Sequence, residues 1–320
     1  MSRLRLLEML DDVLDYRLTL VSAPAGYGKT TLLVDLAYQS KYPTSWLTLD
    51  SLDQDIQRFL THLVKSINLN FPNFGSRTLS LLENTSSLTF DLDQLVRTLV
   101  NDIYDNIPEH FAIILDDYHL VDDNQQINRF ISHLGQEMDE NCHLILSSRT
   151  QFNLPDLALM FSRSLIKGLG YEDLAFQPEE IKSLLERNYQ QHITDQESQI
   201  LAKETEGWIT GLLLSAETNL NNLTTHSRTA KVSGVNVFDY LAEQVLNQQT
   251  PLIQDFLLKT SYLEEFNAEL CKLVLGKPPK GTRWSEIISQ ILKKNLFILP
   301  IDADSTWLRY HHLFRDFLQY

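Results

Sequence analysis

The sequence predicts an α/β fold of the P-loop NTPase type with a parallel sheet, followed by an α-helical domain and a winged-helix domain. Up to about residue 170, apolar β-branched runs alternate with segments of helical periodicity, as in parallel sheets covered by helices. A small-residue turn that ends in Gly-Lys-Thr follows the first of these runs. Strand-like runs become scarce beyond residue 176. We therefore expect a nucleotide-binding domain at 1–170, a helical domain at 171–232 and a winged-helix domain at 233–320.

Five short apolar runs are the predicted strands of the sheet. They are LTLVSA (18–23), SWLTL (45–49), AIILDD (112–117), HLILSS (143–148) and SLIKGL (164–169). Their nearly continuous apolar character is typical of parallel strands that are covered on both faces. Helical spacing recurs between most of them, as in the group Phe59, Leu60, Leu63, Val64 and Ile67.

The C-terminal half is predicted to be mainly helical. QPEEIKSLLERNYQ opens with Pro178 and acidic residues, which favour a helix start. The polar segment 219–234 separates it from a second helical stretch, and we place a domain boundary near residue 233. NLFILPID and TWLRYHH are spaced for a small hairpin, which favours a winged-helix arrangement.

Charge and composition exclude several classes of function. The 27 Lys and Arg residues against 42 Asp and Glu give a net charge of −15, which repels nucleic acid and anionic lipid. Cys142 and Cys271 lack metal-ligand spacing and are interpreted as buried thiols of a reducing compartment. The first twenty residues carry charges throughout and lack the apolar h-region of a secretory signal, and no apolar run reaches the roughly 18 residues of a membrane span, so secretion and membrane insertion are disfavoured. We therefore expect a cytoplasmic chain that binds neither membrane nor DNA directly.

The turn VSAPAGYGKTT (21–31) is the predicted phosphate-binding loop. Backbone N–H groups and the dipole of the following helix bind the anion, Lys29 reaches the terminal phosphates, and the Thr30 hydroxyl binds Mg²⁺. Ala23 stands where the usual pattern has glycine. The predicted nucleotide-binding residues are Ala25, Gly26, Tyr27, Gly28, Lys29, Thr30 and Thr31.

Two further strand ends complete the predicted site. IILDDYH delivers Asp116, which would hold Mg²⁺ together with Thr30, and Asp117, which would polarise an attacking water. LILSSR ends in Arg149, placed to sense a γ-phosphate. Alone, the acidic pair would be interpreted as a solvated turn and the arginine as a surface ion-pair partner. The phosphate loop favours the functional interpretation, in which Lys29, Asp116, Asp117 and Arg149 are catalytic.

The sequence resembles a known family, the large ATP-binding transcriptional regulators of LuxR type typified by MalT. This family belongs to the STAND signal-transduction ATPases. The resemblance covers essentially the whole chain, and loops similar to SPAGYGKTT in that family accommodate Ala23. Seven blocks carry it in order: LTLVSAPAGYGKTTLL, WLTLDSLDQDIQRFL, ILDDYHLV, LILSSRT, LAFQPEEI, ETEGWITGLLLSA and RYHHLFRDFL.

The resemblance implies three domains that close over ATP or ADP with Mg²⁺, followed by an inducer-sensing repeat array and an effector. Because the chain ends in an amphipathic run, we expect these later parts, including the DNA-binding domain, to lie outside it. In related proteins a histidine of the winged-helix domain contacts the ADP β-phosphate. In RYHHLF, His311 aligns with that histidine better than His312 does. The alternative for either residue is a packed or exposed histidine without a ligand. EGWITGL lacks the proline of the related Gly-x-Pro element, so Trp208 is interpreted as core. Arg5 is a candidate to border the adenine.

The predicted function is a nucleotide-governed switch with slow ATP hydrolysis. ADP holds a closed resting form, while ATP and inducer favour an open form that self-associates. Two alternatives stay open: an ordinary P-loop ATPase whose hydrolysis is the output, and a nucleotide-locked interaction module. A kinase is disfavoured because no acceptor-binding motif lies between the loop and the acidic pair.

Overall fold

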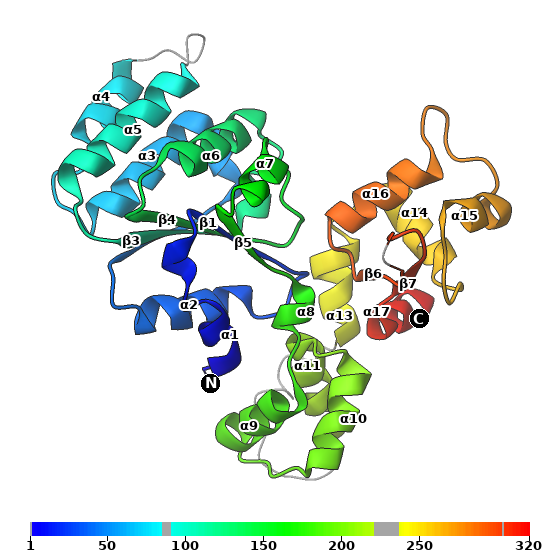
Figure 1. Cartoon of the computed structure of the whole chain (residues 1–320). Helices are drawn as coiled ribbons and strands as arrows, with labels where there is room; N and C mark the ends of the chain where they lie inside the picture. Colours follow the sequence, from blue (N-terminus) through cyan, green and yellow to red (C-terminus); the bar gives the residue numbers. More distant parts are fainter. Residues whose placement is uncertain (1, 85–90, 221–236, 303) are drawn as a thin grey trace. The chain divides into compact units, whose positions relative to one another are not determined.

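The computed structural model of the chain describes residues 2–84, 91–220, 237–302 and 304–320 (Figure 1). The chain forms two compact units. The sheet unit comprises Ser2–Ala23 and Lys29–Asp173, and the C-terminal unit comprises Pro24–Gly28 and Leu174–Tyr320. The short loop Pro24–Gly28 therefore packs with the C-terminal unit. None of the helices in the described parts has both the length and the apolar character needed to cross a membrane.

The sheet unit contains one five-stranded parallel sheet with the order β2-β3-β4-β1-β5. Each predicted strand is present, and helices lie on both faces of the sheet (Figure 1). The strands are β1 Leu18–Ser22, β2 Thr44–Thr48, β3 Phe111–Asp116, β4 Cys142–Ser148 and β5 Ile166–Leu169.

The helices of the sheet unit connect these strands in chain order. They are α1 Leu4–Met9, α2 Lys29–Gln39, α3 Ile56–Asn68, α4 Ser76–Asn84, α5 Leu92–Asn106, α6 Gln125–Glu137 and α7 Leu157–Ser162, with α8 Tyr171–Leu174 at the junction to the second unit. Three short 3₁₀ helices complete the unit: η1 Val13–Asp15, η2 Ser51–Gln54 and η3 Tyr118–Leu120.

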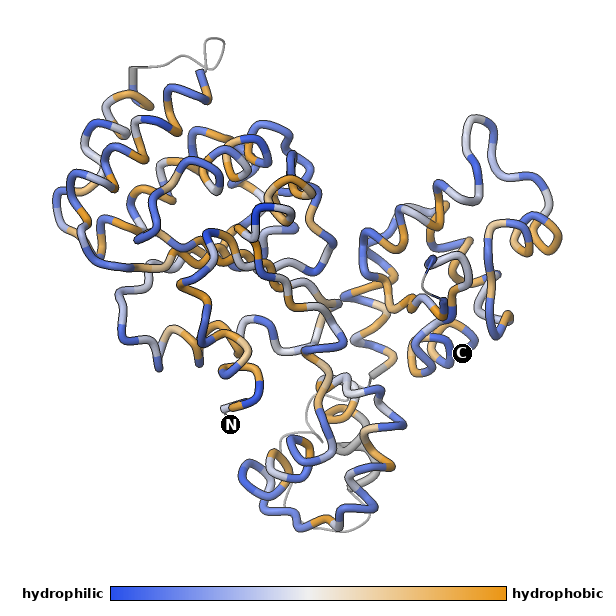
Figure 2. Tube along the Cα trace, in the orientation of Figure 1, coloured by the Kyte–Doolittle hydropathy of each residue, from blue (hydrophilic) through white to orange (hydrophobic). Residues whose placement is uncertain are grey.

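The core of the sheet unit follows the predicted apolar pattern. Strands β3 and β4 are buried at every position, and the strand traces are mostly hydrophobic, whereas the surrounding helices alternate along their length (Figure 2). Helix α3 buries the five apolar residues that predicted it, because their spacing places them on one face: Phe59, Leu60, Leu63, Val64 and Ile67.

The strand register places the candidate site at one edge of the sheet. Strand β4 lies between β1 and β3 and pairs Ser148 with Ser22 and Leu146 with Leu115. All three strands are parallel, so the segments that follow them leave from the same edge. Ligands of open α/β sheets bind at this carboxyl edge, where the loop, the acidic pair and Arg149 all begin.

The C-terminal unit is mainly helical, as predicted. Helix α9 has Pro178 in its first turn, and Glu180 accepts a hydrogen bond from the Gln177 backbone N–H at 3.0 Å. The predicted hairpin is the antiparallel pair β6 Ile298–Pro300 and β7 Leu308–Tyr310. The helices are α9 Pro178–Tyr189, α10 Asp195–Thr205, α11 Ile209–Leu220, α13 Val237–Leu241, the π-helix η4 Ala242–Leu246, α14 Pro251–Thr260, α15 Ala268–Leu275, α16 Trp284–Lys293 and α17 His312–Gln319.

The structure tests the prediction for the two cysteines but not the predicted domain boundary. Cys142 and Cys271 are free and buried, as expected of structural thiols. The predicted domain boundary near residue 233 lies outside the described residues. The division into 1–170, 171–232 and 233–320 therefore stays a prediction.

Candidate nucleotide-binding site

The loop Pro24–Gly28 has the backbone conformation of an anion cradle. Gly26 and Gly28 have φ angles of 82° and 80°, in the left-handed region that glycine adopts without steric cost. A Cβ atom on Gly28 would meet nothing within 4 Å. Helix α2 begins directly afterwards at Lys29, and the N–H groups of a first helical turn lack intrahelical partners. This combination suits a phosphate group.

Lys29 is held inside the sheet unit. The residue is only 7% exposed, and Nζ donates a hydrogen bond to the Ala23 carbonyl oxygen at 2.7 Å. Burial and the neighbouring Arg149 lower the pKa of Lys29 to about 8, although Asp117 and Asp116 act in the opposite direction. A phosphate beside Nζ would favour the charged ammonium, because an opposite charge stabilises the protonated form.

The acidic pair at the end of β3 places its two carboxylates differently. Asp116 is 2% exposed and accepts hydrogen bonds from the Ser147 hydroxyl and, at 3.1 Å, from the Asp117 N–H. Asp117 has a left-handed φ of 59°, and its side chain is 31% exposed. A fixed buried carboxylate suits a metal ligand, and a turned, partly exposed one suits a group that contacts water.

Arg149 and His119 lie in the electrostatic environment of Lys29. Arg149 follows β4 directly and is partly buried. His119 belongs to η3, and its Nδ1 lies 3.7 Å from Asp117 Oδ1. Burial, Arg149 and Lys29 lower the pKa of His119 to about 4, with Asp116 opposing them. His119 is therefore a neutral imidazole at pH 7.

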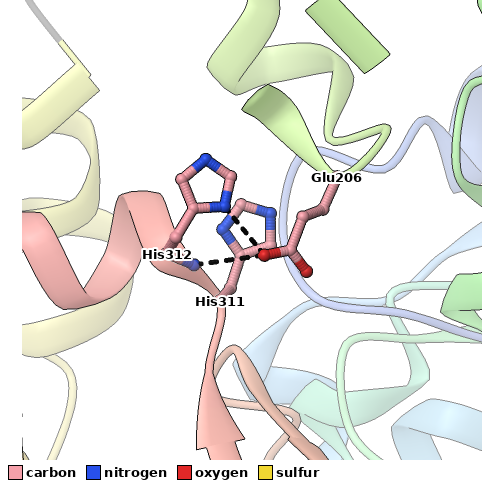
Figure 3. A group of neighbouring side chains, drawn as sticks. All are labelled: Glu206, His311 and His312. Carbon is pink, nitrogen blue, oxygen red and sulfur yellow. Dashed lines mark hydrogen bonds and ion pairs between the residues drawn. The ribbon is translucent and has the colours of Figure 1, made fainter. Parts of the chain in front are cut away.

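A second polar cluster lies in the C-terminal unit, where the segment after α10 meets the start of α17. The Glu206 carboxylate accepts hydrogen bonds from Arg309 Nη1 and Nη2, both at 3.0 Å, and from the His312 ring at 2.8 Å. Figure 3 shows this carboxylate turned toward both histidines. His311 is fully buried, and its Nε2 lies 3.0 Å from the Thr205 carbonyl oxygen.

The pKa values in this cluster follow from these contacts. Burial alone would raise the pKa of Glu206, but hydrogen bonds from His312 and Arg309 hold it well below its usual range. The same hydrogen bond raises the pKa of His312. Burial lowers the pKa of His311 to about 4, so that this imidazole is neutral at pH 7.

The ligand atoms of Glu206, His311 and His312 lie within 4.8 Å of one another, a spacing that a metal ion could bridge. However, both oxygens of the carboxylate already accept hydrogen bonds from Arg309. The two imidazole rings are nearly parallel, at 11° with centroids 5.1 Å apart. Ring-nitrogen lone pairs lie in the ring planes, so parallel, separated rings do not direct them at one ion. The cluster is an ion-paired junction.

One segment of the chain matches a known protein family. Residues 242–320 match the family described as the MalT winged helix domain. These residues are therefore similar to that domain. The matched segment includes β6, β7 and α17, so the predicted winged-helix fold is confirmed for this MalT-like chain.

Relatives extend the likeness to nearly the whole chain. It is 31% identical over 323 residues to the HTH-type transcriptional regulator MalT of Yersinia pestis (strain Pestoides F), covering 98% of this chain and 34% of the relative. The MalT of Klebsiella pneumoniae (strain 342) is 30% identical, covering 99% of this chain and 34% of the relative. The chain thus spans about a third of the length of these relatives, and its predicted resemblance is confirmed.

A solved structure supports the fold alone. The Walker-type ATPase of Pyrococcus abyssi aligns with a TM-score of 0.61 at 15% identity, covering 98% of this chain and 94% of that one. Together with the parallel sheet, it confirms the predicted P-loop NTPase fold.

The structure groups the predicted site residues of this MalT-like chain in two sets. Lys29, Asp116, Asp117 and Arg149 lie in the sheet unit, and the last three all act on the pKa of Lys29. Thr30 and Thr31 are exposed in the first turn of α2. The loop residues Ala25, Gly26, Tyr27 and Gly28 belong to the C-terminal unit, as does His311. The roles of all these residues stay predictions.

Two weaker predictions have specific outcomes. Arg5 donates from Nη2 to the Asp173 carbonyl oxygen at 2.8 Å, and its placement beside an adenine stays a prediction. Trp208 is fully buried, as expected of a core residue. It also donates a hydrogen bond from its indole nitrogen to the Ala25 carbonyl oxygen at 2.9 Å.

Sequence reasoning missed four residues beside these groups. His119 stands two positions after Asp117 in DDYH, and that adjacency was the available signal. Ser147 and Glu206 form hydrogen bonds between segments distant in sequence, and Thr210 contacts the loop in the same way. Nothing in the local sequence indicates these three contacts.

Proposed function

We propose that this MalT-like chain is the ATP- and ADP-binding switch core of a STAND-type signal-transduction regulator. The loop Pro24–Gly28, which leads into α2 at Lys29, is the feature on which the proposal rests. Its two left-handed glycines and the buried ammonium beside it suit nucleotide phosphates. Asp116 and Thr30 suit the accompanying Mg²⁺, which would neutralise charge developing on the transferred phosphoryl group.

Each polar residue of the sheet unit has a proposed task. Lys29 would hold the terminal phosphates, and Arg149 would bind the γ-phosphate through a charge-assisted hydrogen bond. Asp117 would orient the attacking water. Its side chain is shorter than the glutamate that many fast motor ATPases use for this task, so hydrolysis would be slow and would reset the switch.

Nucleotide would act by binding two states with different affinities. ADP would hold a closed resting form, in which His311 contacts its β-phosphate. The Nε2–H of the neutral ring already faces the Thr205 carbonyl oxygen, so contact through the unpartnered Nδ1 would require a second ring proton, which an adjacent phosphate favours. ATP with inducer would favour an open form that self-associates. Moving such an equilibrium from almost entirely closed to almost entirely open takes about 5 kcal/mol of differential binding.

Other functions would belong to parts of the protein outside this chain. Relatives about three times as long support placing the inducer-sensing and effector parts there. The net charge of −15 supports placing DNA contact there as well. We also propose a cytoplasmic location.

The first test identifies the nucleotide that the purified protein carries. The protein is denatured, and the released nucleotide is separated by ion-exchange chromatography for the native chain and for Lys29→Ala. Lys41→Ala, at an exposed position, is the matched control. ADP in the native chain and in the control, and its loss in Lys29→Ala, is the expected result. Absence of nucleotide from all three, together with no binding of added ADP or ATP, would overturn the proposal.

A second test separates the switch from its two alternatives by measuring steady-state ATP turnover. Turnover above about 10 s⁻¹ without any partner, the middle of the usual enzyme range, would favour an ordinary ATPase. Tightly bound ADP with no measurable turnover would favour a nucleotide-locked interaction module. The switch predicts slow turnover, together with a larger self-associated fraction in ATP than in ADP by light scattering.

A further inference from the structure

Two side chains of the segment Trp208–Thr210 hold the carbonyl groups of the phosphate loop. The Trp208 indole Nε1–H donates to the Ala25 carbonyl oxygen at 2.9 Å. Thr210 donates to the Gly26 carbonyl oxygen twice, from its hydroxyl at 3.1 Å and from its backbone N–H at 3.3 Å. All of these residues belong to the C-terminal unit. Two successive loop carbonyls are therefore fixed from the same segment.

Fixing these carbonyl groups also fixes the N–H groups that would bind phosphate. In a planar trans peptide the N–H points opposite to the C=O. The Ala25 carbonyl therefore sets the direction of the Gly26 N–H, and the Gly26 carbonyl sets that of the Tyr27 N–H. Trp208 and Thr210 thus orient two donors of the loop from the side away from an anion.

The packing at Gly26 is consistent with this role. A Cβ atom on Gly26 would lie 2.5 Å from Thr210 Oγ1 and 2.6 Å from Trp208 Nε1, which is too close for any side chain. A Cβ on Gly28, in contrast, would meet nothing within 4 Å. Both glycines have a left-handed φ, but only Gly26 is also required by the approach of Trp208 and Thr210.

On its other sides, Trp208 contacts the winged-helix domain. Its ring meets Phe297 edge-on at 5.0 Å and His311 at 6.0 Å between centroids. Phe297 has a left-handed φ of 55°, which is unusual for a bulky residue and marks local strain. Its carbonyl oxygen accepts the His311 N–H at 2.8 Å, and its ring lies 6.4 Å from that of Tyr27.

We propose that Trp208 and Thr210 are positioning residues of the nucleotide site, and that Trp208 couples the loop to the winged-helix domain at Phe297 and His311. This inference rests on the proposed nucleotide function and adds its route of regulation. Trp208 holds the phosphate-binding conformation of the loop without touching nucleotide. A change in the loop when nucleotide binds or leaves alters the Ala25 contact, and the indole transmits it to His311.

The first experiment removes one hydrogen-bond donor while keeping an aromatic ring. Trp208→Phe loses the N–H that binds Ala25, and the matched control Trp284→Phe loses an indole N–H that donates to the Gly276 carbonyl oxygen, also at 2.9 Å. The affinity for a fluorescent ADP analogue is measured by titration. We expect the dissociation constant to rise at least tenfold for Trp208→Phe and to change less than twofold for the control. A change of less than twofold in Trp208→Phe would overturn the positioning role.

Thr210→Val provides a second variant should Trp208→Phe fold poorly. It loses only the hydroxyl donor, and Thr282→Val, whose exposed hydroxyl donates to the Pro279 carbonyl oxygen, is its control. We expect weaker ADP binding in Thr210→Val and native affinity in Thr282→Val. Equal affinities in the two valine variants would count against the positioning role.

A spectroscopic readout tests the coupling independently of stability. Replacing the other three tryptophans, Trp46, Trp284 and Trp307, by phenylalanine leaves Trp208 as the sole indole. Its emission should shift on adding ADP, with the same midpoint as binding, and His311→Ala should alter that shift. If the native chain binds no nucleotide, the proposed function fails. If the native chain binds and the Trp208 emission stays constant, only the coupling fails.

Discussion

The Lys29 side chain reaches back to the Ala23 carbonyl oxygen, with Nζ 2.7 Å from it. Ala23 is fully buried and stands where the usual loop pattern has glycine. The contact uses only its main chain, and its methyl group is packed in the core. The departure from the pattern therefore leaves the interaction of Lys29 with the loop intact.

Replacing Lys29 by methionine should stabilise the fold while it abolishes nucleotide binding. The pKa of Lys29 falls from 10.5 to about 8, mainly through burial, which corresponds to about 3 kcal/mol against the charged form at roughly 1.4 kcal/mol per unit. Methionine keeps a similar volume without the charge. We expect the free energy of unfolding, measured by urea titration without nucleotide, to rise by up to about 3 kcal/mol.

The exposed Lys41→Met variant is the control and should change the free energy of unfolding by less than about 0.5 kcal/mol. A clear loss of stability in Lys29→Met would show that the ammonium mainly stabilises the fold. That result would contradict its interpretation as a group held for an anionic ligand.

The two aspartates after β3 should separate metal binding from hydrolysis. Asp116→Asn should abolish the gain in ATP affinity that Mg²⁺ gives over EDTA, because the buried carboxylate is the proposed ligand. Asp117→Asn should keep that gain and lower turnover at least tenfold. Calorimetric titration and phosphate release measure the two effects, with the exposed Asp123→Asn as control. Equal behaviour of the two variants would contradict their different roles.

His119 should contribute to turnover and not to ADP binding. Its Nδ1 lies 3.7 Å from Asp117 Oδ1, so the imidazole restricts the carboxylate proposed to orient water. His119→Phe keeps a ring and removes both nitrogens. We expect turnover to fall at least tenfold, while the dissociation constant for ADP changes less than twofold. Unchanged turnover would assign His119 to packing alone.

Much of the fold was predictable because it is encoded locally. Strands β1, β3 and β4 are buried parallel strands and hence nearly continuous apolar runs, whereas the edge strands β2 and β5 are only partly buried. Pro178 with Glu180 marks the start of a helix within three residues. The strand order is not local, but the parallel arrangement still implies that the loop, Asp116 and Arg149 leave from one edge. The catalytic candidates of the sheet unit could therefore be named without coordinates.

The contacts that sequence reasoning missed join distant segments. In the sequence, Trp208 looks like an ordinary apolar residue at the start of a helix. The acceptor of its indole N–H, the Ala25 carbonyl oxygen, lies 183 positions away, so the neighbouring residues give no sign of this hydrogen bond. In the sequence, Glu206 is one of two acidic residues in ETEGW and has no distinguishing feature. Its hydrogen bonds with Arg309 and His312 are visible only in the structure. Apolar periodicity reports burial on one element and carries no signal for a polar contact between elements.

The junction around Glu206 should give the C-terminal unit a measurable pH dependence. His312 has a raised pKa, so its stabilisation is complete below about 6.5, the unfolded value, and is lost as the pH rises through the folded value. Glu206 has a lowered pKa, so its contribution is present above about 4.5 and lost as the pH falls through its folded value. His312 is charged beside ionised Glu206 on the acidic side of neutrality, where the junction is strongest.

The variant His312→Gln tests the loss of stability that we expect as the pH rises and His312 loses its proton. The variant cannot gain a proton, so its deficit in unfolding free energy relative to the native chain should be largest near pH 6 and should shrink toward pH 8. His311, whose pKa is lowered, Arg309 and Asp316 are present in both proteins and cancel in the difference. Urea unfolding at pH 6, 7 and 8 measures it. The control His192→Gln should show a much smaller trend, because Nδ1 of His192 lies 3.6 Å from Glu186 Oε1 at an exposed position, where solvent screens the ion pair. A deficit that grows with pH would contradict the assignment, because the Glu206 hydrogen bond would then favour the neutral imidazole.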